Sequence, residues 1–194
     1  MAKGTRERIM DVALALFAES GSAATPVTAI EAAAGLSPGS GSFYRHFKDK
    51  AELLAAVVDR EISRAVKDPA AQVGADPTAP PTEALARQLL SDLDYLRALE
   101  PLIAILLWER DRTPELADHL RRVTSDRGVE LGMATLAQTT PTGPVSDDPE
   151  AAATVMQSAM IGYWLATRYF GAPPLDIAPE RFTTALARLL TDPR

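Results

Sequence analysis

Apolar residues recur with helical spacing from one end of the chain to the other. Near the N-terminus, five of them share one face of a predicted helix: Ile9, Val12, Ala13, Leu16 and Phe17. Near the C-terminus, five more repeat this spacing of three and four residues: Phe182, Ala185, Leu186, Leu189 and Leu190. Alanine is abundant, while runs of β-branched and aromatic residues are sparse, which favours helices over strands. The sequence therefore predicts an all-α fold with no convincing strand.

Capping signals and turn residues give the predicted helix boundaries. Thr28 with Glu31, and Asp49 with Glu52, have the spacing of a capping box, in which both side chains bind free N–H groups of the first turn. The helix that begins at Thr28 should end at Gly35, and a further short helix must follow that turn. About nine helices result, of which the others cover residues 5–20, 49–67, 82–99, 101–110, 113–138, 150–170 and 179–190.

The chain divides at a proline-rich stretch. Residues 68–81, DPAAQVGADPTAPP, hold four prolines and two aspartates, which indicates a linker or a long loop. The formal net charge is −6, but residues 1–68 are neutral and contain all four lysines. We expect an N-terminal three-helix domain over residues 1–48, a connecting helix over 49–67 and a larger helical domain over 68–194.

Several classes of function lack the residues that they require. The chain has no cysteine, which excludes disulfides, thiolate metal sites and a cysteine nucleophile. It has two histidines 73 residues apart, no Gly-x-Ser-x-Gly motif and no phosphate-binding glycine loop of known spacing. His119, with Asp118 and Arg121 nearby, is too isolated to predict a metal site. We therefore predict a protein that is not an enzyme and that has neither metal nor cofactor.

The apolar stretches predict no targeting or membrane segment. Asp11 and Glu19 interrupt the apolar residues near the N-terminus, so no signal peptide is predicted. The longest uncharged run, residues 151–167, includes Thr, Gln, Ser and Gly, and it predicts a buried helix rather than a membrane span. We expect a cytoplasmic protein with no membrane partner.

A glycine- and serine-rich stretch followed by aromatic and basic residues is the most informative local pattern. Residues 33–37, AAGLS, join two short predicted helices, as in a helix-turn-helix, whose second helix enters the DNA major groove. The small residues that follow let the backbone approach DNA, and the polar and basic side chains after them can bind phosphates or base edges. Phe43 and Phe47, four residues apart, should face inward. The alternative interpretation is an ordinary turn beside a solvated charged face.

Residues 5–58 resemble the N-terminal DNA-binding domain of the tetracycline-repressor-like (TetR) family. The shared features are a first helix ending in LFAESG, a threonine opening the second helix, Ala-Gly in the turn, and Phe-Tyr-Arg-His-Phe with lysine before the fourth helix. Eight residues, Leu36 to Phe43, separate the turn glycine from the tyrosine, where six are common in the family. The longer turn leaves open whether Ser37 or a residue near Gly39 caps the third helix.

The resemblance implies a role for each matching residue. Thr28 would cap the second helix against phosphate, and Lys50 would meet phosphate at the start of the fourth helix. Tyr44 and His46 would contact the DNA backbone, and the small residues before them would read bases, although serine can serve several bases. With the neighbouring basic side chains, the predicted DNA-binding residues are Thr28, Ser40, Gly41, Ser42, Tyr44, Arg45, His46, Lys48 and Lys50.

The C-terminal helices match the family in number and length, which implies dimerisation and a ligand chamber. The helix over 150–170 is apolar on nearly every face, so we expect it to pair, with the helix over 179–190, against a second copy of the chain. The predicted interface residues are Tyr163, Thr167, Phe182, Leu186 and Leu189. The predicted chamber lining is Tyr95, Leu99, Ile103, Leu106, Trp108, Met133, Met156, Met160 and Trp164. The alternatives are burial within one subunit for the first set and an ordinary core for the second.

These observations together predict a ligand-responsive, DNA-binding transcriptional regulator. The resemblance implies a homodimeric repressor that a small apolar molecule releases from a pseudo-palindromic operator in double-stranded DNA. A second hypothesis is a helical dimer that binds a small molecule or a protein without reading DNA. A third is a cofactor-free enzyme that uses a C-terminal cavity.

Overall fold

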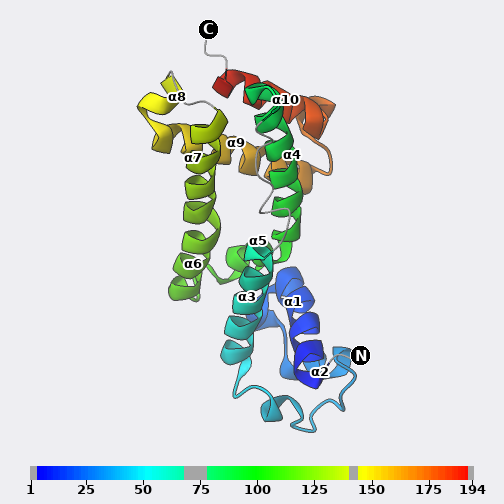
Figure 1. The fold of residues 1–194 in the computed structure, drawn as a ribbon. Helices are drawn as coiled ribbons and strands as arrows, with labels where there is room; N and C mark the ends of the chain where they lie inside the picture. The colour runs from blue at the N-terminus through cyan, green and yellow to red at the C-terminus, as the bar shows by residue number, and fades with distance from the viewer. Residues whose placement is uncertain (1–3, 68–77, 140–143, 192–194) are drawn as a thin grey trace. The chain divides into compact units, whose positions relative to one another are not determined.

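A computed structural model describes residues 4–67, 78–139 and 144–191, and all regular secondary structure in these ranges is helical (Figure 1). The predicted all-α fold is therefore confirmed. The chain forms two compact units. The first unit comprises Met1–Val66 and Leu99–Leu120, and the second comprises Lys67–Ala98 and Arg121–Arg194. The predicted domain boundaries at residues 48 and 67 stay predictions, and most of the predicted linker lies outside the described residues.

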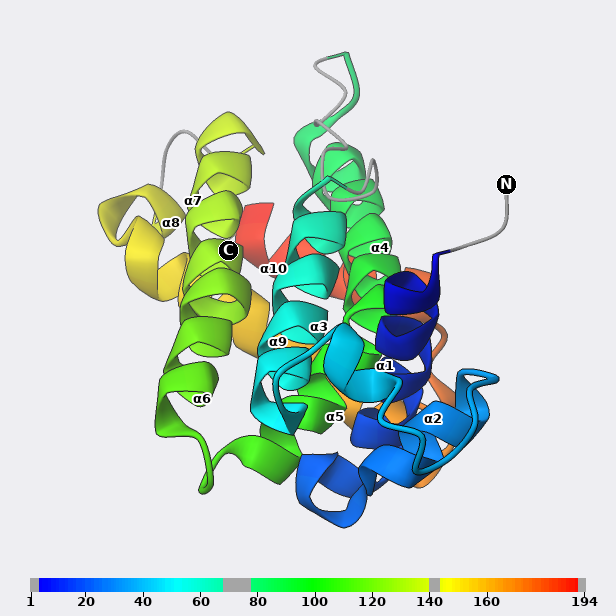
Figure 2. The same ribbon diagram turned by 90° about the horizontal axis from the view of Figure 1, so that it is seen from below.

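The first unit is built around its N-terminal helix. Its elements are α1 (Thr5–Ala24), α2 (Val27–Ala33), the 3-10 turn η1 (Phe43–Arg45), α3 (Lys50–Val66), α5 (Glu100–Glu109) and α6 (Pro114–Arg121). Helix α1 packs against α2, α3 and α5, and α1 and α3 lie side by side in both views (Figures 1 and 2). The apolar stripe of α1 supplies the centre of this core, since Ile9, Ala13 and Phe17 are completely buried.

The end of α1 is shaped by a glycine. Gly21 has φ of 74° within the helix that we expected to stop there, so the helix breaks at this residue although helical turns continue to Ala24. A Cβ atom at Gly21 would lie 3.1 Å from Cβ of Trp108 on α5, so a larger residue would also crowd that contact. Close packing of α5 on α1 thus adds to the backbone requirement for glycine.

The second unit contains the remaining helices. They are α4 (Pro81–Ala98), the π-helical segment η3 (Arg122–Asp126), α7 (Arg127–Thr139), α8 (Pro144–Asp147), α9 (Pro149–Phe170), the 3-10 turn η4 (Pro174–Asp176) and α10 (Pro179–Thr191). Helix α4 packs along α10, and α7 packs along α9. The buried side chains between these helices include Leu85, Leu89, Leu136, Met156, Met160 and Leu186.

Two boundaries in the second half of the chain differ from the prediction. The single helix expected over 113–138 is interrupted by the π-helical segment Arg122–Asp126, a change in hydrogen bonding that apolar spacing does not reveal. A short helix, Pro144–Asp147, lies within the stretch expected to be a loop. Helix α9 begins at Pro149, one residue before the predicted start, where Asp148 accepts a hydrogen bond from the Ala151 N–H at 3.0 Å. Within the described ranges, no helix has both the length and the apolar character needed to cross a membrane.

Candidate nucleic-acid interface

The stretch after α2 does not form the α-helix that we predicted. Residues 37–48, which we call the recognition segment, contain turns followed by a single 3-10 turn over Phe43–Arg45. Gly39 and Gly41 have φ values of 78° and 73°, which a right-handed helix does not allow. The expected third helix is therefore wrong as an α-helix, because the glycines of the longer turn adopt left-handed backbone angles.

A buried glutamate of α2 holds this segment. The Glu31 side chain is 1% exposed, and its two carboxylate oxygens accept hydrogen bonds from the Gly39 N–H at 2.7 Å and from the Phe43 N–H at 3.0 Å. Neither Ser37 nor a residue near Gly39 caps the 3-10 turn; the acceptor at its first N–H comes from α2. Sequence reasoning missed this role, because the donors lie 8 and 12 residues beyond the acid.

The predicted capping box at the start of α2 is wrong. The helix begins one residue earlier, at Val27, with Pro26 at the N-cap and no side-chain hydrogen bond there. Thr28 is exposed in the first turn, and Glu31 is engaged with the recognition segment instead. Contact between Thr28 and DNA remains a prediction.

Two phenylalanines anchor the recognition segment by facing the core, as their spacing predicts. Phe43 and Phe47 are 0% and 1% exposed, and their ring centroids are 5.9 Å apart. The guanidinium of Arg6 on α1 lies 4.5 Å from the Phe47 ring centroid, which adds a cation–π contact. Tyr44 meets the Phe43 ring edge to face at 5.1 Å and is 61% exposed. The inward orientation of the phenylalanines is confirmed, and Tyr44 is left on the surface.

The predicted base-reading residues lie between the two anchored N–H groups. The hydroxyl oxygens of Ser40 and Ser42 are 2.7 Å apart and share a hydrogen bond, and the Ser42 N–H donates to the Ser40 hydroxyl at 3.3 Å. Ser40 is exposed, while Gly41 and Ser42 are half-buried. These three residues thus form a small, internally bonded surface.

The basic residues after the serines occupy the end of the segment and the start of α3. Arg45 and Lys48 are exposed, His46 is half-buried, and the Lys50 ammonium donates to the Thr25 carbonyl at 2.8 Å. Thr25 lies just before α2, so Lys50 joins the start of α3 to the chain that precedes α2. An ammonium group has three donors, so this bond leaves Lys50 able to bind phosphate as well.

The capping box predicted at the start of α3 is confirmed in its main feature. The Glu52 N–H donates to the Asp49 carboxylate at 2.8 Å, and the Glu52 carboxylate accepts from the Lys48 N–H at 2.7 Å. The acid therefore reaches one residue further back than in the usual motif. These bonds fix the backbone of Lys48 directly beside the predicted phosphate contacts.

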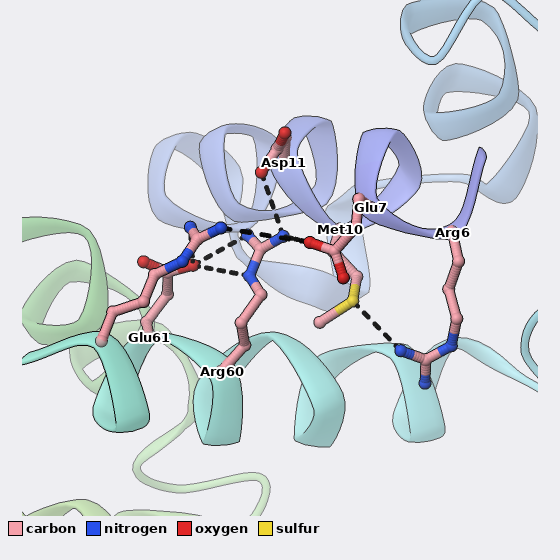
Figure 3. Close-up of polar contacts among 7 residues, drawn as sticks. Arg6, Glu7, Met10, Asp11, Arg60 and Glu61 are labelled. Carbon is pink, nitrogen blue, oxygen red and sulfur yellow. Dashed lines mark hydrogen bonds and ion pairs between the residues drawn. The ribbon is translucent and has the colours of Figure 1, made fainter. Parts of the chain in front are cut away.

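An ion cluster joins α3 to α1 (Figure 3). Arg60, whose side chain is 12% exposed, lies 3.0 Å from Glu7, 3.0 Å from Asp11 and 2.8 Å from Glu61. Burial tends to lower the pKa of the Arg60 guanidinium, but hydrogen bonds to Glu7 and Glu61 and the surrounding negative charge outweigh it, so that pKa is raised. Sequence analysis missed this cluster, because its partners are more than 40 residues apart.

The predicted chamber residues are divided between the two units. In the first unit, Leu99 is buried, Ile103 and Leu106 are half-buried, and Trp108 is 51% exposed. The Trp108 indole N–H donates to the Ala18 carbonyl at 3.2 Å, beside Gly21. In the second unit, Met156, Met160 and Trp164 are buried, whereas Tyr95 and Met133 are half-buried. The chamber as a whole stays a prediction.

A surface hollow of the second unit lies apart from most of these residues. Its volume is about 680 Å³, and it is lined by Pro80, Thr82, Glu83, Ala185, Arg188 and Leu189 of α4, α10 and the residue before α4. Within the described ranges, no group of three or more histidine, aspartate and glutamate residues could hold a metal ion. His119, the histidine considered for a metal site, lies 3.6 Å from the Asp59 carboxylate.

Most of the predicted dimer residues also pack within their own unit. The rings of Tyr163 and Phe182 stack with centroids 4.2 Å apart, and the Tyr163 hydroxyl donates to the Ile177 carbonyl at 2.7 Å. Thr167 is half-buried and Leu186 is buried. Leu189, by contrast, is 75% exposed, in line with a role at an interface. The interface stays a prediction.

Comparison with known proteins places the first unit in a family. The family model described as "Bacterial regulatory proteins, tetR family" matches residues 9–57. The uncharacterised HTH-type transcriptional regulator YerO of Bacillus subtilis is 30% identical over 124 residues, which are 62% of this chain and 42% of that protein. The HTH-type transcriptional regulator AcrR of Shigella flexneri is 43% identical over 56 residues, 29% of this chain and 25% of that protein. The chain thus matches less than half the length of these curated relatives.

The similarity to a solved structure extends further. A TetR-like transcriptional regulator from Rhodococcus sp. RHA1 superposes with a TM-score of 0.68 at 25% identity, and the match covers 98% of this chain and 96% of that one. The fold is therefore shared over both units, and the sequence match is concentrated in the residues that carry the recognition segment. On these grounds residues 9–57 match the TetR family of bacterial regulatory proteins, and the chain shares the fold of a TetR-like regulator.

Proposed function

We propose that this protein is a transcriptional regulator that binds operator DNA through its first unit. The observation that carries the proposal is the recognition segment. Apart from Pro38, its exposed side chains are polar or basic and include Ser40, Tyr44, Arg45 and Lys48, whereas its buried anchors are held by α1 and α2 or by each other. Recognition of phosphates and base edges requires exposed hydrogen-bond donors that buried residues hold in fixed positions.

The charge distribution supports DNA binding by this segment rather than by the whole surface. The formal net charge of −6 disfavours non-specific attraction to DNA. Arg45, Lys48 and Lys50 nevertheless lie within six residues of one another and directly follow Tyr44 in the sequence. We infer that these residues bind phosphates and that Ser40 and Ser42 face base edges.

Two copies of the chain would place two recognition segments on successive turns of DNA. Helix-turn-helix dimers read half-sites about 34 Å apart. Large exposed apolar residues of the second unit support an interface formed by α9 and α10; they are Val155, Tyr169, Phe170, Leu175 and Leu189. A pseudo-palindromic operator is the expected partner.

The second unit is the proposed site of a small apolar effector. Binding of the effector would shift α3, change the separation of the two recognition segments and release the operator. The coupling free energy between effector binding and operator binding would be about 1–3 kcal/mol. Repression follows from this scheme by analogy with the family. An effector that strengthened operator binding would refute the release scheme and leave DNA binding intact.

Fluorescence anisotropy with DNA from upstream of the protein's own gene, over a salt series, tests the function. We expect saturable binding that survives competitor DNA. Replacing Lys48 with alanine should lower the slope of log affinity against log salt by about one unit. Lys67→Ala is the matched control, because Lys67 follows the last residue of α3, whose length of about 25 Å separates it from Lys50, and carries the same charge. No binding to any duplex, even at low salt, would contradict the proposal and favour a dimer that does not read DNA.

A further inference from the structure

We propose that Glu31 is a positioning residue for base recognition: its carboxylate fixes the recognition segment as a loop rather than a helix, and that loop presents the serines to DNA. This inference rests on the proposed DNA-binding function. It assigns the readout to residues 37–43, whose shape is set by an acid on the preceding helix.

The geometry around Glu31 is that of a clamp. One carboxylate oxygen accepts the Gly39 N–H at 2.7 Å, and the other accepts the Phe43 N–H at 3.0 Å. These two donors flank the residues predicted to read bases, so both ends of the readout stretch are tied to one side chain. With 1% exposure, the carboxylate has no competing water at its surface.

A carboxylate suits this position better than any other side chain. Both of its oxygens accept, and hydrogen bonds from neutral N–H groups to a charged acceptor are stronger than those between neutral groups. A buried charge is costly unless it is paired or hydrogen-bonded. Within the described part of the chain, no basic side chain forms an ion pair with Glu31, so the hydrogen bonds from the loop stabilise this charge. The loop and the acid therefore depend on each other.

The two glycines show that this loop conformation is required by the sequence. Gly39 and Gly41 have φ of 78° and 73°, and a Cβ atom added at either would meet no atom within 4 Å. Space is therefore not the reason for glycine; the left-handed backbone is.

The hydrogen bond between Ser40 and Ser42 limits how many hydroxyl donors the loop can present to a base. The Ser40 and Ser42 hydroxyls share one hydrogen bond of 2.7 Å, and either oxygen can be the donor. One hydroxyl proton therefore remains for DNA, and its position depends on which serine donates. A loop of fixed shape holds the Ser40 and Ser42 hydroxyls in defined positions, so that they can bind particular base edges. In a mobile loop they could not, and the protein would bind DNA through phosphate contacts alone.

The sign of the effect on DNA binding separates positioning from simple electrostatics. If Glu31 acted only as a negative charge near phosphates, its neutralisation would strengthen binding to every duplex. If it positions the loop, Glu31→Gln should weaken specific binding and leave non-specific binding unchanged or slightly stronger. The glutamine amide nitrogen is a donor and cannot replace the second acceptor.

The clamp can be tested without DNA by amide hydrogen exchange of the wild-type protein and of Glu31→Gln. The Gly39 and Phe43 amides should be protected in the wild type and should exchange about 10- to 100-fold faster in the variant, which corresponds to loss of a charge-assisted hydrogen bond. Glu19→Gln is the matched control, because Glu19 is exposed on α1 and the charge change is the same. Unprotected amides in the wild type, or unchanged exchange in Glu31→Gln, would overturn the proposal.

The readout is tested by the ratio of specific to non-specific affinity for DNA. Glu31→Gln should lower this ratio by about tenfold or more, and Glu19→Gln should not change it. An unchanged ratio would overturn the role in recognition. If Glu31→Gln fails to fold, the wild-type exchange rates still decide whether the clamp exists, and Glu31→Asp, which keeps the charge on a shorter side chain, should show the same loss of specificity. A wild-type protein that binds no DNA would refute the regulatory function and the readout role together, even with protected amides.

Discussion

The two units of this protein use buried polar groups in different ways. In the first unit, buried carboxylates bind main-chain N–H groups far away in the sequence: Glu31 binds two in the recognition segment, and Glu109 accepts the Ser22 N–H at 2.9 Å across 87 residues. In the second unit, Gln88 donates to Asp92 at 2.9 Å, one turn along the same helix. Among the described residues, the buried side-chain atoms without a hydrogen-bond partner are the Gln88 carbonyl oxygen and, in the first unit, Nη2 of Arg60, which lies 2.8 Å from Glu61. The long-range bonds fix a backbone shape, whereas the local bond does not.

The two units also differ in the large apolar side chains that they expose. The second unit exposes large apolar side chains at the end of α9, in η4 and in α10, including Phe170 at 84%, Leu175 at 92% and Leu189 at 75%. The large exposed apolar side chains of the first unit are Tyr44, Leu107 and Trp108, and both aromatic rings among them also make contacts within the unit. The first unit thus holds its exposed aromatic side chains in place, whereas the second leaves large apolar side chains open, as the proposed dimer interface requires.

The largest effect is expected from Phe43→Ala, which removes an anchor of the recognition segment. Phe43 is completely buried, so the variant should lower the free energy of unfolding by about 3–5 kcal/mol. Tyr44→Ala is the matched control, because the neighbouring ring touches Phe43 but is 61% exposed. Urea unfolding measures both. Equal losses for the two variants would show that burial does not fix the segment.

Breaking the Arg60 cluster should come next. Arg60→Met leaves the carboxylates of Glu7, Asp11 and Glu61 without their shared cation, and we expect a loss of about 2–3 kcal/mol at neutral pH and low salt. Arg97→Met is the control from the second unit, because Arg97 pairs with Asp94 on the surface and is 58% exposed. That change should cost less than about 0.5 kcal/mol. Comparable losses would remove the contrast between the units.

The buried glutamate of α5 should matter somewhat less. Glu109→Leu leaves the Ser22 N–H without its acceptor, and the free energy of unfolding should fall by about 2 kcal/mol. Exchange of the Ser22 amide should accelerate accordingly. The exposed Glu115→Leu change on α6 provides the control. If Ser22 stayed protected in Glu109→Leu, the hydrogen bond would not be what holds the end of α1 against α5.

The smallest effect concerns pH and belongs to the second unit. Burial raises the pKa of Asp92 from 3.8 to about 6, while the hydrogen bond from Gln88 opposes the shift. The native state therefore binds more protons than the unfolded state between these values, so the free energy of unfolding should fall as pH rises from about 4 to 6. Asp92→Asn should remove this fall and stabilise the protein by about 1 kcal/mol at pH 7, allowing for partial exposure.

The free energy of unfolding, measured against pH for the wild type and the variants, tests this prediction for Asp92. Asp94→Asn, two residues along α4 and 62% exposed, should keep the wild-type fall. A profile of Asp92→Asn that runs parallel to the wild type would show that the ionised Asp92 carboxylate does not destabilise the second unit.

Features encoded within a few residues could be predicted from the sequence. The all-α fold, the cap of α3 at Asp49 and the burial of Phe43 and Phe47 all follow from spacings of three or four residues. The same local logic failed at Glu31, because Thr28-x-x-Glu31 has the spacing of a capping box while the acid binds donors up to 12 residues away. Gly39 and Gly41 could have indicated the loop, because two glycines in a short turn disfavour a helix.

Features that depend on distant partners could not be predicted. The Arg60 cluster and the bond from Ser22 to Glu109 join segments 49 to 87 residues apart, and no pattern in the sequence pairs them. The inclusion of Leu99–Leu120 in the first unit has the same origin. The candidate interface was predictable as a set of exposed polar residues, but the shape of its backbone was not.

Selection from a pool of random DNA duplexes, with the wild-type protein and with Tyr44→Ala, tests whether the recognition segment reads DNA. The wild type should enrich an inverted repeat whose half-site centres are about one helical turn, or a multiple of it, apart. Tyr44→Ala should enrich the same repeat weakly or not at all. If the folded wild-type protein enriches no sequence, even at low salt, the recognition segment is not a DNA-reading surface and the account is wrong.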